Sequence, residues 1–531
     1  MTEQYILKTL GCKANLYDSQ LIEQELQSKG WSPESQSKGG AEKASDSEVK
    51  LCIVNSCTVT NEADKQSRKM AAKLAREYPG ATIVMTGCGA EVDPQAYLNS
   101  KGVDLVIGNQ DKNRFTDLLF QNDLLFQNTD LLLQKRNNLP SSISSSSSSP
   151  IPSHILKPET PHILGSVENY TSIISRHPMD REWPSALDSF ATPPTQLKGY
   201  ADKTRAFLKI QEGCNSFCTY CIIPYGRGPS RSLRPREILT QVKELVSQGI
   251  REVIITGTNI GDYGIEWREP EAIDKSKNLA DLLEMILNET QLERLRISSL
   301  DPSEITPQIM ALMESNPRLC PHFHVSLQSP HSRILRLMKR NYDADDVRQC
   351  LEQIAKMPAP VGGIFVGMDI ITDFPGETEE EFEWGFNTLK ELPWSRLHVF
   401  PYSERMGTPA TRLPKSVPQH LRVLRARRLT QLSMERLKQN YTAILEKCRR
   451  EGLSLDSILT EKQGSDNWVS GYTPNYLKVM IPARPLSGSI ESLELLEESL
   501  GRNQLVKAEP IDLMIDSKAG DVAFVARLSK T

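Results

Sequence analysis

Short apolar runs alternate with amphipathic segments through the first hundred residues. The apolar runs have the length of strands, and the segments between them have the 3.6-residue periodicity of helices. Asn61 stands where the second helix should be capped. Alternation of this kind is typical of a doubly wound parallel sheet, an α/β fold. The predicted strands are Tyr5–Leu10, Leu51–Asn55, Ala81–Thr86 and Val103–Ile107, and the predicted helices are Asn15–Lys29 and Glu62–Tyr78.

A second alternating stretch begins near Gly199. It contains six predicted strands, which are too few for a closed eight-stranded barrel and indicate a partial (β/α)6 barrel. A long helix, about Pro418 to Arg450, follows and carries the densest basic run of the chain. The last eighty or so residues change to short alternating segments, which predict a small β-barrel. The six predicted strands are Ala206–Ile210, Glu252–Thr256, Glu293–Ser298, His322–Leu327, Ile364–Ile371 and Arg396–Phe400.

Between these two stretches the periodic pattern disappears. A short near-repeat is followed by the homopolymer Ser144–Ser149, with prolines on both sides. Such a composition buries too little apolar surface to offset the entropy of ordering, so we expect a disordered, low-complexity insert. The expected organisation is therefore 1–119 N-terminal domain, 120–199 insert, 200–439 partial barrel and 440–531 small β-barrel domain.

Composition limits the classes of function. The 531 residues include 63 Lys+Arg and 67 Asp+Glu, a net charge of −4, so any nucleic-acid contact depends on local patches. No apolar run approaches the length of a membrane span, and Met1–Cys12 lacks a signal-peptide pattern. We therefore expect a cytoplasmic protein with no membrane partner, in which ten cysteines serve metal or redox chemistry rather than disulfides.

Three cysteines follow the first strand of the partial barrel in a C-x3-C-x2-C row. Cys214, Cys218 and Cys221 are one short of the four thiolates that close a structural zinc or iron–sulfur site. A cluster held by three thiolates leaves one iron with an open coordination position. The alternatives are a zinc site with a distant fourth ligand, or three unrelated core cysteines.

Three further cysteines occupy equivalent places in the N-terminal domain. Cys12, Cys57 and Cys88 each come directly after a predicted strand. The carboxyl ends of parallel strands share one edge of the sheet, so these distant residues can meet there. Cys52 lies inside a predicted strand and is expected to be an ordinary buried residue.

The motifs around these cysteines carry a family resemblance. The C-x3-C-x2-C loop resembles that of the radical S-adenosylmethionine (SAM) enzymes, and Thr9–Asn15, Asn55–Thr60 and Thr86–Cys88 resemble the methylthiotransferases among them. The resemblance implies two 4Fe–4S clusters. Cys214, Cys218 and Cys221 would be the catalytic set that binds SAM through its cluster, and Cys12, Cys57 and Cys88 would hold a second cluster that carries the sulfur. Gly89 departs from the family pattern, which usually has a larger side chain there.

The resemblance also implies a SAM pocket at the carboxyl ends of the barrel strands. Turn chemistry alone would explain the Gly, Asn, Asp and Pro residues of these loops. Phe374–Thr378 is close to the family string, although Thr372 and Asp373 replace the usual small residues before it. The expected pocket residues are Tyr220, Gly257, Asn259, Ser299, Gln328 and Gly376.

The string Arg227–Ser232 resembles the branch that acts on N6-threonylcarbamoyladenosine at tRNA position 37, and Gly471–Tyr476 resembles the RNA-binding TRAM domain. The implied partners are the tRNA anticodon stem-loop, gripped by the basic helix, and an electron donor such as flavodoxin or ferredoxin. Alternative substrates are N6-isopentenyladenosine in tRNA and an aspartate of a ribosomal protein. The alternative from another class is a non-catalytic iron–sulfur protein that binds tRNA.

Overall fold

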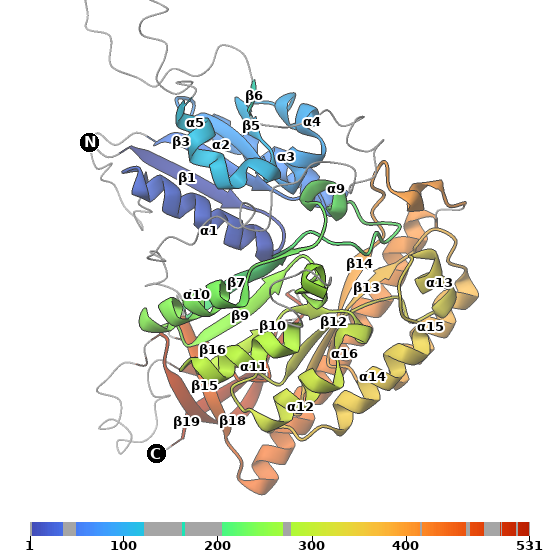
Figure 1. The fold of residues 1–531 in the computed structure, drawn as a ribbon. Coiled ribbons are helices and arrows are strands. Elements are labelled where there is room, and N and C mark those ends of the chain that lie inside the picture. The colour runs from blue at the N-terminus through green and yellow to red at the C-terminus, as the bar shows by residue number, and fades with distance from the viewer. Residues whose placement is uncertain are drawn as a thin grey trace, which may run out of the picture. The chain divides into compact units, whose positions relative to one another are not determined.

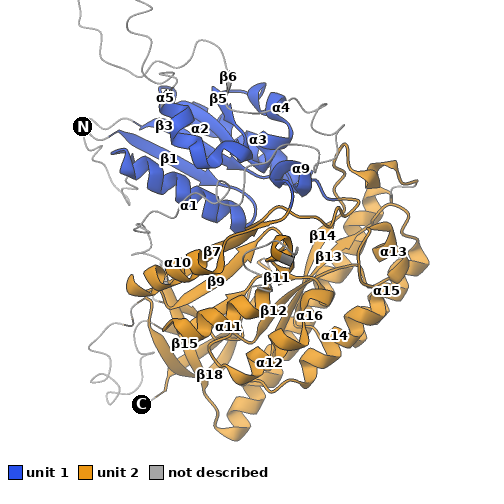
Figure 2. Ribbon diagram, viewed as in Figure 1, with its two compact units in different colours: residues 1–195, 221–229 blue, residues 196–220, 230–531 orange. Residues whose placement is uncertain are grey.

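The computed structural model describes residues 3–34, 49–121, 162–164, 204–268, 278–414, 417–463, 468–482, 500, 502–516 and 519–529. The chain forms two compact units (Figure 2). Unit 1 comprises residues 1–195 together with 221–229, and unit 2 comprises 196–220 together with 230–531. The nine residues Cys221–Pro229 thus belong to the first unit, although the chain on both sides of them belongs to the second.

Unit 1 is built on a six-stranded, fully parallel sheet with the order β2-β1-β3-β4-β5-β6. Helices cover both faces of this sheet (Figure 1). The strands are β1 (Gln4–Thr9), β2 (Ser32–Pro33), β3 (Val49–Ser56), β4 (Thr82–Gly87), β5 (Leu105–Ile107) and β6 (His162–Leu164). The helices are α1 (Lys13–Ser28), α2 (Asn61–Glu77), α3 (Cys88–Val92), α4 (Pro94–Leu98) and α5 (Phe115–Gln121), with the 3-10 helix η1 (Asn109–Arg114) before α5.

Alternate residues of β3 enter two different cores. Leu51 and Ile53 pack in one cluster with residues of α1 and α5, whereas Cys52 and Val54 pack in another with residues of α2. A strand that is buried on both faces is the mark of a doubly wound sheet, which confirms the predicted fold of this unit. Cys52 is fully buried, in agreement with its expected role as a core residue.

Two details of this unit differ from the sequence prediction. The side chain that caps α2 is Thr60, which accepts a hydrogen bond from the backbone N–H of Ala63, and not Asn61. The expectation of an insert without regular structure is wrong for β6, which pairs in parallel with β5, and α5 runs two residues beyond 119. The remainder of the expected insert, 122–161 and 165–199, lies outside the described residues.

Unit 2 contains the expected six long parallel strands, arranged in two hydrogen-bonded sets of order β10-β9-β7-β8 and β11-β12-β13-β14. One residue, Ser298, separates β10 from β11. The first set is β7 (Arg205–Glu212), the short antiparallel β8 (Arg231–Ser232), β9 (Glu252–Gly257) and β10 (Arg294–Ile297). The second is β11 (Ser299–Leu300), β12 (His322–Gln328), β13 (Phe365–Thr372) and β14 (Arg396–Pro401).

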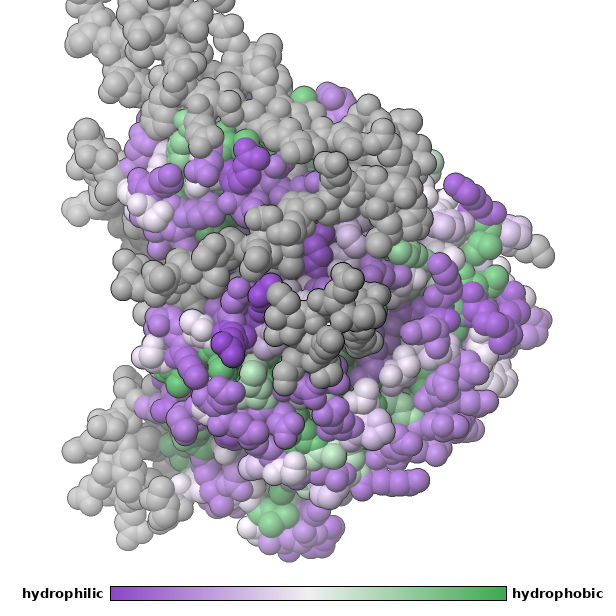
Figure 3. Space-filling view, viewed as in Figure 1, coloured by the Kyte–Doolittle hydropathy of each residue, from purple (hydrophilic) through white to green (hydrophobic). Residues whose placement is uncertain are grey.

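Helices alternate with these strands along the chain. Their outer surfaces are largely hydrophilic in the face shown (Figure 3). No helix in the described ranges is long and apolar enough to cross a membrane. The helices are α10 (Pro235–Ser247), α11 (Leu279–Glu289), α12 (Pro307–Ser315), α13 (Ser332–Leu337), α14 (Ala344–Lys356), α15 (Glu379–Glu391) and α16 (Gln419–Glu451), while the short α9 (Ile223–Arg227) belongs to unit 1.

The last strands close into a barrel of order β15-β16-β17-β19-β18. Its core also takes in Leu437, Tyr441 and Leu445 of α16, so the expected boundary between 439 and 440 falls inside a continuous helix. The barrel strands are β15 (Leu455–Gln463), β16 (Trp468–Tyr472), β17 (Lys478–Pro482), β18 (Leu505–Asp516) and β19 (Asp521–Leu528).

The N-terminal half of α16 is less available to RNA than its basic sequence indicates. Arg425 is 3% exposed and forms ion pairs with Asp373 and Glu377. Arg428 pairs with Glu383 of α15. The expectation that the basic helix grips RNA therefore does not hold for Arg425, which is buried, whereas Arg428 remains partly exposed beside its acidic partner.

Candidate iron–sulfur and cofactor sites

The three cysteines of unit 1 lie at the carboxyl ends of β1, β3 and β4, which are adjacent in the sheet. Cys12 precedes the first residue of α1, Cys57 follows the last residue of β3, and Cys88 begins α3. The expectation that they share one edge of the sheet is confirmed. Gly11, at φ +97°, is required by this packing, because a Cβ there would lie 2.7 Å from both Cβ and Sγ of Cys57.

Buried amides fix the backbone around these cysteines. The Asn15 side chain donates to the carbonyl oxygens of Leu10, at 2.8 Å, and Ser56, at 3.0 Å. Asn55 donates in return to the Asn15 carbonyl, at 2.9 Å. These bonds join the loop after β1 to the end of β3 and so hold the segments that carry Cys12 and Cys57. Gly89 suits the same packing, since a Cβ there would come within 2.2 Å of the Tyr97 hydroxyl.

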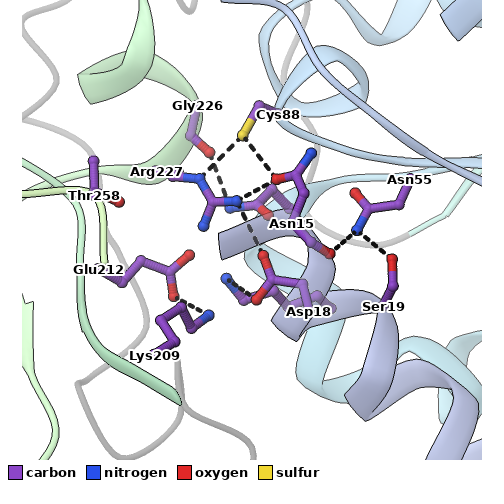
Figure 4. A network of polar contacts seen from close by, with 12 residues as sticks. Asn15, Asp18, Ser19, Asn55, Cys88, Lys209, Glu212, Gly226, Arg227 and Thr258 are labelled. Atoms are coloured by element: carbon purple, nitrogen blue, oxygen red, sulfur yellow. Dashed lines mark hydrogen bonds and ion pairs between the residues drawn. The ribbon is translucent and has the colours of Figure 1, made fainter. Parts of the chain in front are cut away.

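Arg227 lies in the middle of a buried polar network of unit 1 (Figure 4). Its Nε donates to Cys88 Sγ at 3.1 Å, and its Nη2 donates to Asp18 at 3.0 Å and to the Asn15 side-chain oxygen. The Lys112 ammonium lies 3.6 Å from the same Asp18 carboxylate. The arginine is 1% exposed, so its interactions with the sulfur and the carboxylate are little screened by solvent.

The surroundings of the thiols fit an iron–sulfur cluster. Burial raises the pKa of Cys57 to about 12, and burial also raises the pKa of Cys88 although the Arg227 charge opposes this shift. Thiols of this kind ionise when a metal centre binds them, and a guanidinium beside the sulfur compensates the negative charge of the thiolates. Among the described residues, no three His, Cys, Asp or Glu side chains are placed to hold a single metal ion.

The C-x3-C-x2-C loop leaves the carboxyl end of β7, as predicted. The Thr219 backbone N–H donates to the Met338 carbonyl oxygen at 3.0 Å, and its hydroxyl donates to the Leu337 carbonyl oxygen at 2.8 Å. The Thr219 carbonyl oxygen accepts from the Ala410 N–H at 2.8 Å. The loop is thus attached on both sides to segments far along the chain. Cys221, the third expected ligand, begins the stretch that is grouped with unit 1.

A second buried arginine contacts the sulfur of this loop. Nη1 of Arg340 lies 3.0 Å from Cys218 Sγ, and Nη2 pairs with Asp301. Burial works against the charge of Arg340, but Tyr342, Asp301 and Cys218 outweigh it and raise the arginine pKa. Burial raises the pKa of Cys214 to about 11. A buried thiol next to a guanidinium, that of Cys218, therefore occurs in unit 2 as well.

Five of the six expected SAM-pocket residues lie at or shortly after strand ends, and the sixth, Tyr220, belongs to the cysteine loop. Gly257 ends β9 at a close approach, because a Cβ there would lie 2.8 Å from the Gln211 carbonyl oxygen. Gln328 ends β12 with a positive φ of 61°. Tyr220 stands edge-on to Phe374, with ring centroids 6.2 Å apart. The other three are Asn259 just after β9, Ser299 at the start of β11 and Gly376 just after β13.

Glu304, an acidic residue beside this edge, was not predicted from the sequence. Burial, together with the nearby Asp301 charge, raises the pKa of Glu304 to about 7. Glu304 lies so close to Gly261 that a Cβ there would come within 1.9 Å of its carboxyl carbon. The signal that could have identified this residue is its place three positions after Asp301 in the pattern of a capping box. Arg340 gave no such signal, because 122 residues separate it from Cys218.

The comparisons with known proteins agree with this geometry. Residues 4–108 match the Uncharacterized protein family UPF0004, and residues 208–386 match the Radical SAM superfamily. The first range contains Cys12, Cys57 and Cys88, and the second contains Cys214, Cys218 and Cys221. Among solved structures, the radical S-adenosylmethionine methyltransferase TsrM from Kitasatospora setae matches 77% of each chain with a TM-score of 0.47 and 14% identity, too low for a functional comparison.

Curated relatives match nearly the whole chain. The threonylcarbamoyladenosine tRNA methylthiotransferase MtaB of Bacillus subtilis (strain 168) is 30% identical over 93% of this chain and 94% of its own length. The protein of the same name from Aquifex aeolicus (strain VF5) is 31% identical over 89% of this chain and 97% of its own. The chain therefore belongs to the family of the threonylcarbamoyladenosine tRNA methylthiotransferases, which are radical SAM enzymes.

Proposed function

We propose that this protein converts N6-threonylcarbamoyladenosine at tRNA position 37 to its 2-methylthio derivative. The observation that carries the proposal is the presence of two separate three-cysteine sets, one in each of the two matched family regions. Enzymes of this family use SAM and two 4Fe–4S clusters, and six cysteines in two sets meet that requirement. A non-catalytic iron–sulfur protein would need neither the open position of each set nor the SAM-pocket loops.

The proposed ligand sets are Cys214, Cys218 and Cys221 for the catalytic cluster, and Cys12, Cys57 and Cys88 for the second. When bound, the clusters and SAM supply the radical and sulfur-transfer chemistry. Arg340 and Arg227 orient the sulfurs of Cys218 and Cys88 and balance their charge. Gly257, Asn259, Ser299, Gln328 and Gly376, with Tyr220, would line the SAM pocket at the strand ends.

The RNA partner is proposed to be the anticodon stem-loop. The small β-barrel, whose Gly471–Tyr476 string resembles the TRAM domain, would contact the RNA backbone together with exposed basic residues such as Arg427 of α16. The electron donor would be a flavodoxin or ferredoxin, and the reaction would take place in the cytoplasm.

Two triple variants test the ligand sets. Replacing Cys214, Cys218 and Cys221 by Ala should leave about half the iron and abolish SAM cleavage, because each set holds one of two equal clusters. Replacing Cys12, Cys57 and Cys88 should remove the other half, retain some SAM cleavage and stop thiomethylation. The matched control replaces the buried cysteines Cys320, Cys350 and Cys448, which should keep all the iron. Iron loss in the control variant would refute the assignment.

The substrate is tested by nucleoside mass spectrometry of tRNA from cells with and without the gene. Loss of the 2-methylthio form of N6-threonylcarbamoyladenosine in the deletion strain is the expected result. Loss of the thiomethylated isopentenyl form instead would move the protein to that branch of the family. Unchanged tRNA with an altered ribosomal protein would refute an RNA substrate.

A further inference from the structure

Three polar side chains meet on one face of the sheet formed by β12, β13 and β14. In the register of these strands, His324 lies opposite Gly367, and Asp369 lies opposite His398. His324 Nε2 lies 2.8 Å from Asp369 Oδ1. The rings of His324 and His398 stack with centroids 5.1 Å apart and an angle of 12° between their planes. The two histidines come from strands that are not neighbours, with β13 between them.

Gly367 lies beneath one of these rings. A Cβ at Gly367 would lie 3.5 Å from His398 Nε2, an ordinary contact distance, so the His398 ring extends over the glycine. A glycine inside a central strand weakens that strand and commonly marks a place where a ligand approaches closely. We call His324, Asp369 and His398 the histidine cluster.

The histidine cluster faces away from the helices. Near the end of β13, Ile370 is buried and lines a small cavity with Phe382 and Leu389 of α15, whereas Asp369 and Ile371 on either side of it are partly exposed. The side chain of Ile370 therefore lies on the helix-covered face of β13. Successive side chains of a strand point to opposite faces, which places Asp369 on the inner face of the curved sheet. The cluster is not sealed by packing, since the side chains of His324 and Asp369 are 20% and 23% exposed. These polar groups can therefore meet a ligand on the inner face.

An exposed aromatic residue lies above the histidine cluster. Phe400 follows His398 by two positions on β14, whose pairing with β13 is regular throughout, so both side chains are on the inner face. Phe400 is about 7 Å nearer the carboxyl end of the strand. It is 46% exposed, although it is a large apolar residue. The carboxyl ends of these strands carry the proposed SAM pocket, so Phe400 lies on the side of the cluster nearer to the cofactor.

We propose that Phe400 stacks on the target adenine and that His398 and His324 bind the carboxylate and hydroxyl of its threonylcarbamoyl group. This inference rests on the proposed function and names the residues that select the substrate within it. RNA-binding proteins commonly hold an unstacked base on an aromatic ring. Imidazole N–H groups donate to carboxylate and hydroxyl oxygens, and Asp369 fixes the orientation of the His324 ring.

The same arrangement disfavours an aliphatic tail. An isopentenyl group placed against the histidine cluster would remove water from the imidazole and carboxylate groups without giving them hydrogen-bond partners. Sites built to hydrogen-bond a polar group reject analogues that lack it far more strongly than apolar pockets reject a missing methylene. The cluster would thus separate the two tRNA substrates considered for this family.

Binding measurements with two RNAs isolate the contribution of the threonylcarbamoyl group. Reconstituted full-length protein is titrated with anticodon stem-loops that carry either adenosine or N6-threonylcarbamoyladenosine at position 37. For the wild type we expect the modified RNA to bind roughly tenfold or more tightly, the range for hydrogen bonds to a charged group. His398→Phe should lower this ratio severalfold, because only His324 then remains to donate to the threonylcarbamoyl group, and His398→Gln, which retains an N–H donor, should restore part of it.

Two further variants provide the controls. His322→Phe is the matched change, because His322 precedes His324 by two positions on β12 but is closed off between Phe365 and Tyr476, with which its ring packs. It should keep the wild-type ratio. Phe400→Leu should weaken the binding of both RNAs by a similar factor, about fivefold or more, since stacking on the base does not depend on the threonylcarbamoyl group.

The results separate this inference from the proposed function. A wild-type ratio of one, or a wild-type ratio in His398→Phe, would overturn the inference even if the enzyme thiomethylates its substrate. An equal loss of binding for both RNAs in His398→Phe would also overturn it, because that pattern indicates a structural role. Absence of the 2-methylthio product from wild-type protein with both clusters would instead refute the proposed function, whatever the binding ratio.

Discussion

At the scale of single residues, buried arginines accompany the proposed cluster ligands in both units. Arg227 donates to Cys88, and Arg340 donates to Cys218. Each arginine also pairs with a buried aspartate, Asp18 in one case and Asp301 in the other. A guanidinium held in this way keeps its charge and its direction, so it acts as a fixed electrostatic partner of the sulfur.

Arg227→Gln tests this role. Loss of the cation beside Cys88 should make the cluster of Cys12, Cys57 and Cys88 harder to reduce, because a nearby positive charge favours the form with one more electron. A loss of about 1–2 kcal/mol corresponds to a potential lower by roughly 50–100 mV. The potential is measured by a redox titration followed by EPR. The protein used has Cys214, Cys218 and Cys221 replaced by Ala, so that the signal comes from the cluster of Cys12, Cys57 and Cys88.

The control for this change is Arg234→Gln, at an exposed arginine of the same chain segment, which should leave the potential unchanged. Arg227→Lys should give an intermediate value, because it keeps the charge but not the fork of donors. An unaltered potential in Arg227→Gln, with the iron retained, would contradict the assigned role.

Single residues also show what the sequence could predict. The positions of Cys12, Cys57 and Cys88 could be inferred because each follows a strand, and parallel strands bring their carboxyl ends to one edge. The partner of Cys88 could not, since Arg227 stands 139 residues away and only the folded chain brings them together. Arg227 belongs to the Arg227–Ser232 motif, but no local sequence pattern indicates which side chain it contacts.

At the scale of elements, α16 shows that a basic run need not be an open surface. Its buried positions include Arg425, Leu429, Ser433, Leu437, Tyr441 and Leu445, which follow one another at intervals of four. Arg425 is thus the first member of the stripe that packs against the unit, a position that the helical periodicity would have revealed. The nearby Asp373 and Glu377 make this burial of an arginine tolerable.

Removing this charge should destabilise unit 2. Arg425→Met leaves Asp373 and Glu377 buried without their cation, and breaking a buried pair in this way costs about 3–5 kcal/mol. Chemical denaturation followed by circular dichroism provides the measurement. Arg427→Met, at an exposed position of the same helix, should change the stability by no more than about 0.5 kcal/mol. Equal effects of the two changes would show that the ion pairs of Arg425 contribute little.

At the scale of the whole molecule, the order of the parts was predictable but their limits were not. The change from strand–helix alternation to a serine- and proline-rich stretch marked the end of the first sheet domain. Within that stretch, His162–Leu164 adds a strand beside β5, and three residues give too weak a pattern to be recognised. The nine residues Cys221–Pro229 join unit 1 through tertiary contacts, which no linear pattern reports.

Two deletions test the place of β6. Replacing 122–161 by a flexible Gly/Ser linker should leave the melting temperature of unit 1 close to that of the wild type, since it retains β6. Replacing 122–198 should lower it, because β5 loses its hydrogen-bonded neighbour and becomes the edge of the sheet. Calorimetry on both variants gives the comparison. The same melting temperature for both would mean that β6 contributes nothing to the sheet.

The grouping of residues 221–229 with unit 1 has a consequence for the synthesis of the protein. Proteins emerge from the ribosome N-terminus first, and their domains commonly fold in that order. The first sheet can form early. The contacts of Arg227 with Asp18 and Cys88 can form only later, after the first strand of unit 2 has been translated. At typical elongation rates this delay is on the order of ten seconds. A gene truncated before residue 221 would therefore encode an N-terminal fragment that lacks Arg227, the residue that contacts Asp18 and Cys88 in the full chain.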